Sequence, residues 1–175
     1  LFITDRARAF DLAMKYSPRR IEALEGWDAF YPHDPELAVE IFSWYDLLFR
    51  NSRDPVARKR YAVESERWAK AATDRSPEVA WFWTYYAKAL WNRAEVEPGA
   101  QGLAYYFTAL DYYRRAIELF PVSGVVTFQY AEALKGLGNG LINAGRVDDG
   151  RRLVNESREM YVRADLLARY TELVR

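Results

Sequence analysis

The chain has 175 residues, of which 50% are apolar and 29% charged, so it can bury a core and is not of the disordered class. Its 25 Lys and Arg balance 25 Asp and Glu, and a net charge of zero argues against a dedicated binder of nucleic acid or anionic membrane. Cysteine is absent and His33 is the sole histidine, so the chain lacks the side chains that thiolate chemistry and His-rich metal centres require. We therefore expect a protein that is not an enzyme, with no catalytic, cofactor-binding or metal-ligating residues.

Helix starts are marked along the chain by pairs of an N-cap residue and a proline, because proline is tolerated at the first helical position. The pairs are Ser17-Pro18, Asp34-Pro35, Asp54-Pro55 and Ser76-Pro77. Ser123 is a further expected N-cap, and Pro98-Gly99 and Gly145 are expected breaks. Apolar residues between these marks recur with a period near 3.6 rather than 2. The pattern predicts eight helices, at residues 3–16, 18–31, 35–51, 55–75, 77–97, 100–120, 123–144 and 147–174.

Gly136, Gly138 and Gly140 lie two residues apart inside the helix expected at 123–144. Glycine in a helix interior costs roughly 1 kcal/mol relative to alanine, so the three residues need a reason. Either the helix breaks or hinges here, or glycine permits close packing against the last helix.

Residues 109–121 resemble the second helix of a tetratricopeptide repeat (TPR), a family in which small residues let two helices approach and an aromatic residue fills the gap. Ala109, Tyr113, Ala116 and Pro121 stand at the family spacing. The family's positions in the first helices fall on Ile41, Trp44, Tyr45 and Leu48, on Trp83, Tyr86, Ala87 and Leu90, and on Thr127, Tyr130, Ala131 and Leu134.

The spacing of the repeats departs from the family. The interval is 42 residues from Pro35 to Pro77 (77 − 35) and 44 from Pro77 to Pro121 (121 − 77), whereas the family repeat is about 34 residues. Lengthened pairs leave two other architectures open, an α-solenoid outside the family or a closed helical bundle.

The resemblance implies an all-α, right-handed α-solenoid of about four antiparallel helix pairs. The expected domain is a single one over residues 1–175, with pairs at about 3–31, 35–75, 77–120 and 123–174.

The resemblance also implies a concave groove lined by fixed positions of each first helix. Among those positions, the expected binding residues are Phe42, Phe49, Arg50, Trp81, Thr84, Lys88, Trp91, Asn92, Phe128, Glu132 and Lys135. Exposed aromatic rings there would anchor apolar groups, while Lys88 or Arg50 could hold a carboxylate or a peptide backbone. The alternative is that the aromatic residues are buried core.

The expected function is a non-catalytic scaffold that binds a protein, a peptide or a second copy of itself through this groove, with no nucleic acid and no transmembrane segment. The alternative rests on a weaker resemblance to the periplasmic T-component proteins of substrate-binding-protein-dependent (TRAP) transporters. It is a transporter accessory component that binds a small hydrophobic or carboxylated ligand. The absence of cysteine and a start without Met favour the periplasm or cell envelope, with the cytoplasm as the other option.

Overall fold

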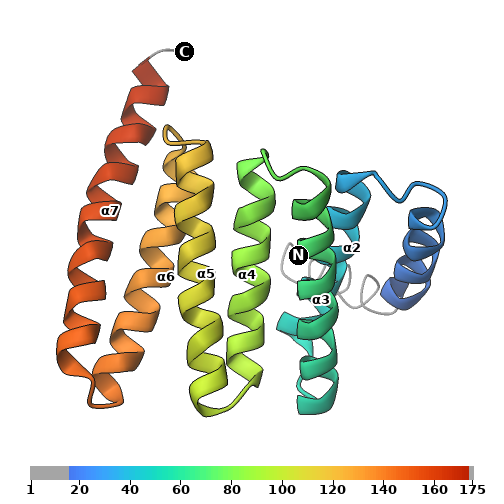
Figure 1. Ribbon diagram of the computed structural model, residues 1–175, viewed down its shortest axis with the longest axis horizontal. Coiled ribbons are helices and arrows are strands. Elements are labelled where there is room, and N and C mark those ends of the chain that lie inside the picture. The colour runs from blue at the N-terminus through green and yellow to red at the C-terminus, as the bar shows by residue number, and fades with distance from the viewer. Residues whose placement is uncertain (1–15, 174–175) are drawn as a thin grey trace, which may run out of the picture. The chain divides into compact units, whose positions relative to one another are not determined.

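The computed structural model describes residues 16–173, and within that range the chain forms helices and short connections without a strand. In chain order the elements are a helix described from residue 16 to 28, α2 (Pro35–Asn51), α3 (Pro55–Arg75), α4 (Ala80–Val96), α5 (Gly99–Leu119), α6 (Gly124–Asn143) and α7 (Val147–Leu173) (Figure 1). The all-α prediction is therefore confirmed. The helix expected at 3–16 lies almost entirely outside the described residues.

The chain divides into two compact units that join at Ser76 and Pro77. Unit 1 contains the helix 16–28 and the pair α2–α3, and unit 2 contains the pairs α4–α5 and α6–α7.

In unit 1, two of the expected N-caps are confirmed. The Asp34 carboxylate accepts hydrogen bonds from two backbone N–H groups in the first turn of α2, at 2.9 and 3.3 Å. The Asp54 carboxylate accepts one from the first turn of α3, at 3.1 Å. Pro35 and Pro55 are the first residues of the two helices, so the sequence positions both helices as predicted.

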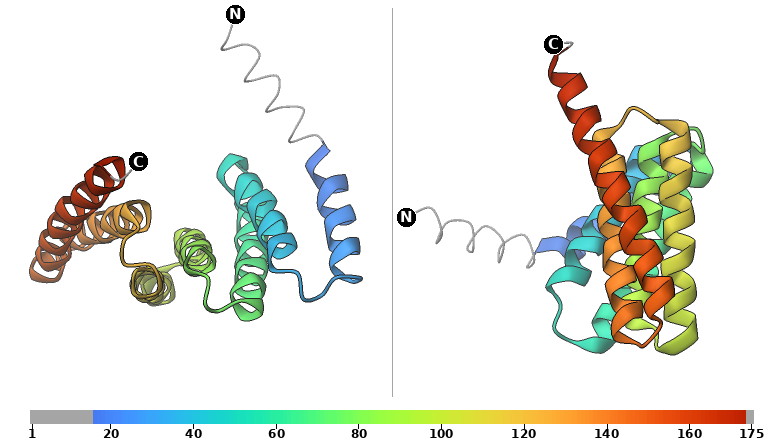
Figure 2. Two further views of the ribbon diagram at one scale, coloured as in Figure 1. Left: turned by 90° about the horizontal axis from the view of Figure 1, so that it is seen from above. Right: turned by 90° about the vertical axis from the view of Figure 1, so that its left-hand side faces the viewer.

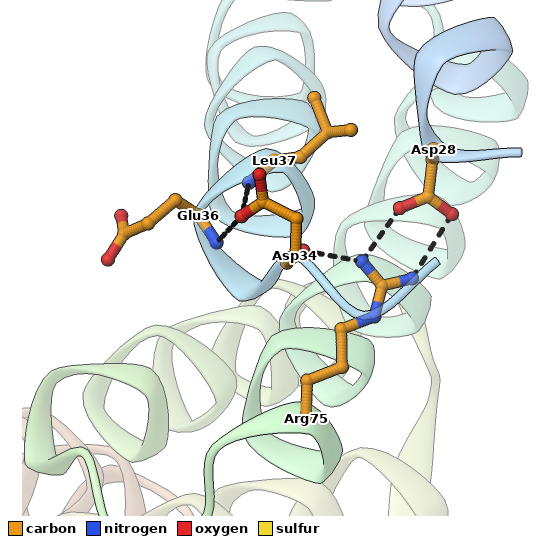
Figure 3. Close-up of polar contacts among 5 residues, drawn as sticks. All are labelled: Asp28, Asp34, Glu36, Leu37 and Arg75. Atoms are coloured by element: carbon orange, nitrogen blue, oxygen red, sulfur yellow. Dashed lines mark hydrogen bonds and ion pairs between the residues drawn. The ribbon is translucent and has the colours of Figure 1, made fainter. Parts of the chain in front are cut away.

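The turn between the helix 16–28 and α2 is held by Arg75, the last residue of α3 (Figure 3). Its Nη1 and Nη2 atoms donate to the two carboxylate oxygens of Asp28 at 2.7 and 3.1 Å. Nη1 also donates to the Asp34 carbonyl oxygen at 2.7 Å. The guanidinium group thereby joins all three helical segments of unit 1 at one end.

Two expected helix starts are wrong. Residues 16 and 17 are already helical, so Ser17 does not begin the helix that contains Pro18. Ser76 instead caps the C-terminus of α3, where its backbone N–H donates to the Ala72 carbonyl, and α4 begins only at Ala80. The indole Nε1 of Trp83 donates to the Pro77 carbonyl at 2.7 Å, which holds residues 77–79 as a turn ahead of the helix.

In unit 2, α4 pairs with α5, α6 pairs with α7, and α5 also packs against α6. Viewed from above, α5 lies out of the line that joins α4 and α6 (Figure 2, left). Most residues at the TPR signature positions are buried where these helices pack together. The buried ones are Tyr86, Ala87, Leu90, Ala109, Tyr113, Ala116, Thr127, Tyr130, Ala131 and Leu134.

Glycine brings α6 and α7 into close contact, and α6 runs unbroken through all three of its interior glycines. A Cβ atom added to Gly138 would lie 2.9 Å from the Gly150 carbonyl oxygen, and one added to Gly150 would lie 2.4 Å from the Gly138 carbonyl oxygen. Gly140 has open space around it. Close packing is therefore the explanation for Gly138.

A buried tyrosine links three helices of unit 2. The Tyr130 hydroxyl of α6 donates to Glu156 of α7 at 2.5 Å and accepts from the Arg114 Nε of α5 at 2.7 Å. Burial raises the pKa of the Tyr130 phenol, and the hydrogen bond to Glu156 raises it further. The network therefore requires the neutral phenol.

This protonation requirement predicts a loss of stability in alkali. An unfolded tyrosine ionises near pH 10, whereas folded Tyr130 stays neutral to higher pH. Its contribution is fully present below pH 10 and is lost as the pH rises above it, by at most about 1.4 kcal/mol per pH unit. Urea unfolding from about pH 9 to 11 should show a shallower decline for Tyr130→Phe than for the unchanged chain. Parallel declines would contradict this assignment.

Candidate functional site

A hollow of about 410 Å³ lies between α4 and α6 in unit 2, with one residue of α5 completing its lining. α4 contributes Thr84, Tyr85, Lys88, Trp91 and Asn92, α5 contributes Tyr113, and α6 contributes Phe128, Gln129, Glu132 and Ala133. Residues three or four apart lie on one face of a helix, so the spacing of each set turns it toward the same space. One face of α4 and one face of α6 therefore form most of the wall of the hollow.

Aromatic rings from both helices line the hollow. Trp91 of α4 packs edge-on against Tyr106 of α5, with the ring centroids 4.5 Å apart. The same indole lies beside Gly136 of α6, because a Cβ atom added to Gly136 would lie 3.3 Å from the Cζ2 atom of Trp91. Phe128 of α6 remains 50% exposed although it contacts Tyr161 of α7. The hollow therefore offers a supported indole and an accessible phenyl ring as apolar surface.

The hollow also carries one cation and one carboxylate on different helices, Lys88 on α4 and Glu132 on α6. Glu132 accepts a hydrogen bond from the Tyr161 hydroxyl, and the Lys135 ammonium lies 5.7 Å from the centroid of the Tyr161 ring. Tyr161 thereby fixes the α6 wall through contacts with Phe128 and Glu132. The arrangement suits binding through apolar contact and paired polar groups.

Most of the groove residues expected in unit 2 come together at this hollow. Six of the eight line it, namely Thr84, Lys88, Trp91, Asn92, Phe128 and Glu132. Trp81 and Lys135 are absent from its lining. Thr84 and Asn92 are buried, so they contribute to its floor more than to its rim.

In unit 1 the expected groove residues have other surroundings. Phe42 and Phe49 are each 2% exposed, and the Arg58 guanidinium lies 4.4 Å from the centroid of the Phe49 ring. Arg50 forms an ion pair of 2.8 Å with Asp46 one turn earlier in α2. Neither phenylalanine ring is accessible as an anchor, because both are already covered.

Four lining residues were missing from the prediction, namely Tyr85, Tyr113, Gln129 and Ala133. Gln129 follows Phe128 and stands three residues before Glu132, so helical spacing alone places it near the expected face. Tyr113 stands at a signature packing position, and no sequence signal shows that its ring also reaches the hollow.

Unit 1 has a separate hollow of about 400 Å³ with a charged lining. There Glu25 accepts hydrogen bonds from the Tyr45 hydroxyl at 3.1 Å and from Arg67 at 3.3 Å. Arg67 also pairs with Glu64 at 2.8 Å. None of the expected groove residues lines this hollow, which makes it a weaker candidate for a ligand site than the hollow of unit 2.

No group of three or more His, Asp or Glu side chains in residues 16–173 could hold a metal ion. No helix in the same range has the length and apolar character needed to cross a membrane.

Among known proteins, the chain matches solved structures in fold but matches no curated protein in sequence. No protein-family model and no curated protein matches the chain. A solved structure titled "MamA MSR-1 C2", of a TPR-containing protein, aligns with a TM-score of 0.59 at 15% identity, covering 91% of this chain and 72% of that one. Identity at this level shows the fold alone and gives no support to the transporter resemblance. The chain is similar to this protein in having an all-α, TPR-like solenoid fold.

Proposed function

We propose that the protein is a non-catalytic helical-repeat scaffold that binds a segment of a partner polypeptide in the hollow between α4 and α6. The observation that carries the proposal is the convergence of six expected groove residues on one hollow. The TPR-like fold supports the same assignment. The segment belongs to another protein or to a second copy of this chain.

The chemistry of the hollow suits a polypeptide. An apolar side chain of the partner would contact Trp91 and Phe128, since accessible aromatic rings are frequent anchors at protein interfaces. Lys88 and Glu132 would fix the direction of the segment, because one attracts carboxylates and the other attracts cations. Binding of this kind relies on one or two apolar anchors, with charged groups providing specificity.

A small apolar ligand is the less favoured occupant. Sites for such ligands usually enclose most of the ligand surface, whereas Phe128 is half exposed and Trp81 does not contribute to the lining. A half-exposed anchor ring suits a chain that continues beyond the hollow at both ends.

The proposal is tested by selecting peptides from a displayed library of random 12-residue sequences and measuring their affinity by fluorescence anisotropy. Phe128→Ala should weaken the selected peptide by about tenfold or more, which corresponds to about 1.4 kcal/mol and is typical of an interface anchor. Lys88→Met should weaken peptides that carry an acidic residue.

The matched control is Phe120→Ala. Phe120 is 42% exposed, caps the C-terminus of α5 and does not line the hollow, so its loss should change affinity less than twofold. A library that yields no binding peptide, or peptides that respond equally to both alanine variants, would contradict the proposed function.

A further inference from the structure

Gln129 is a side chain of the hollow with an unused hydrogen-bonding atom. Its Oε1 atom is buried and has no hydrogen-bond partner among the described residues, yet the residue is part of the hollow's lining. Buried acceptors without a partner are rare in folded proteins, and each lowers stability by an amount comparable to a hydrogen bond. The unpaired carbonyl of Gln129 therefore lowers the stability of the protein without contributing a hydrogen bond to the fold.

The location of this amide suggests a use for it. Phe128, the preceding residue, is the exposed ring of the hollow, and Glu132 lies one turn further along the same helix. Because Gln129 is part of the lining of the hollow, a ligand placed between Phe128 and Trp91 would bring a hydrogen-bond donor to this carbonyl.

We infer that Gln129 is a specificity-determining residue of the hollow, and that the bound polypeptide donates a backbone N–H group to its Oε1 atom. This inference rests on the proposed function, because it takes the same hollow as the binding site. A backbone N–H adjacent to the anchoring side chain satisfies the acceptor whatever that side chain is. A proline at that position of the partner would be excluded, since proline has no N–H.

The first arm of the test measures stability without any ligand. Methionine resembles glutamine in shape and helix propensity but lacks the unpaired carbonyl. Gln129→Met should raise the melting temperature by about 3–6 °C. The matched control is Gln101→Met, since Gln101 is exposed in α5 and is the only other glutamine of the chain. This variant should leave the melting temperature unchanged.

The second arm measures binding of the peptide selected for the proposed function. Each backbone nitrogen of that peptide is methylated in turn, and the affinity of each version is measured for the unchanged chain and for Gln129→Met. One methylation should weaken binding to the unchanged chain by about fivefold and leave binding to Gln129→Met unaffected.

The outcomes separate this inference from the proposed function. If Phe128→Ala weakens the peptide but no methylation depends on Gln129, the hollow binds peptides and the inference about Gln129 is wrong. If Gln129→Met fails to raise the melting temperature, the unused acceptor is absent and the inference is also wrong. If no peptide responds to Phe128→Ala, both the proposed function and the inference fail.

Discussion

Gly150→Ala should lower the free energy of unfolding by about 2 kcal/mol net, because overpacking costs up to about 3 kcal/mol where the obstacles include backbone. The added Cβ would lie 2.4 Å from the Gly138 carbonyl oxygen and 2.9 Å from the Ile142 backbone nitrogen. Neither atom can move without separating α6 from α7. The gain in helix propensity from alanine, about 1 kcal/mol, is too small to offset this clash. Urea unfolding followed by far-ultraviolet circular dichroism measures the change.

The control for this prediction is Gly140→Ala in α6. No atom lies within 4 Å of the added Cβ at this position, so only the helix propensity should change. We expect stability to rise by about 0.5–1 kcal/mol. Equal effects at the two positions would show that α6 and α7 are not in the close contact described.

Arg75→Met should lower the free energy of unfolding by about 2–3 kcal/mol, since it leaves a largely buried carboxylate and a backbone carbonyl without their charged donor. The Arg75 and Asp28 side chains are only 15% and 16% exposed. The double variant Arg75→Met/Asp28→Asn should lose less free energy of unfolding than the two single variants together, because either change alone removes the Arg75–Asp28 ion pair. Thermal and urea unfolding of the three variants measure this coupling.

Lys70→Met provides the comparison within the same helix. Lys70 pairs with Asp74 in α3, but both side chains are more than half exposed. Exposed pairs contribute little, so the expected change is below about 0.5 kcal/mol. A loss as large as that of Arg75→Met would mean that burial does not determine the strength of these pairs.

Local chemistry allowed most of the helices to be predicted. Asp34, Asp54 and Ser123 act as N-caps where expected, because capping depends on residues a few positions apart. Ser76-Pro77 has the same local pattern but does not start a helix, since α4 begins three residues after Pro77. The Pro77 carbonyl instead accepts a hydrogen bond from the Trp83 indole. A local signal does not show which helix the cap residue will join.

Interactions between distant residues could not be predicted in this way. Asp28 and Arg75 are 47 positions apart and meet only because three helical segments converge. The candidate site shows the same limit. Spacing grouped Trp91 with Lys88 and Phe128 with Glu132, and all four line one hollow, but the same spacing in α2 gave Phe42 and Phe49, which are buried. Exposure depends on the neighbouring helices, which spacing along one helix does not reveal.

The most direct test of the binding account uses the indole N–H signals of the six tryptophans. The chain is labelled with ¹⁵N at tryptophan, and the selected peptide is titrated while two-dimensional NMR spectra are recorded. Trp91 lines the hollow, whereas Trp27 is 62% exposed in unit 1 and lies outside it. The account predicts that the Trp91 signal moves in a saturable manner while the Trp27 signal stays in place. A peptide that shifts Trp27 and leaves Trp91 unchanged would contradict it.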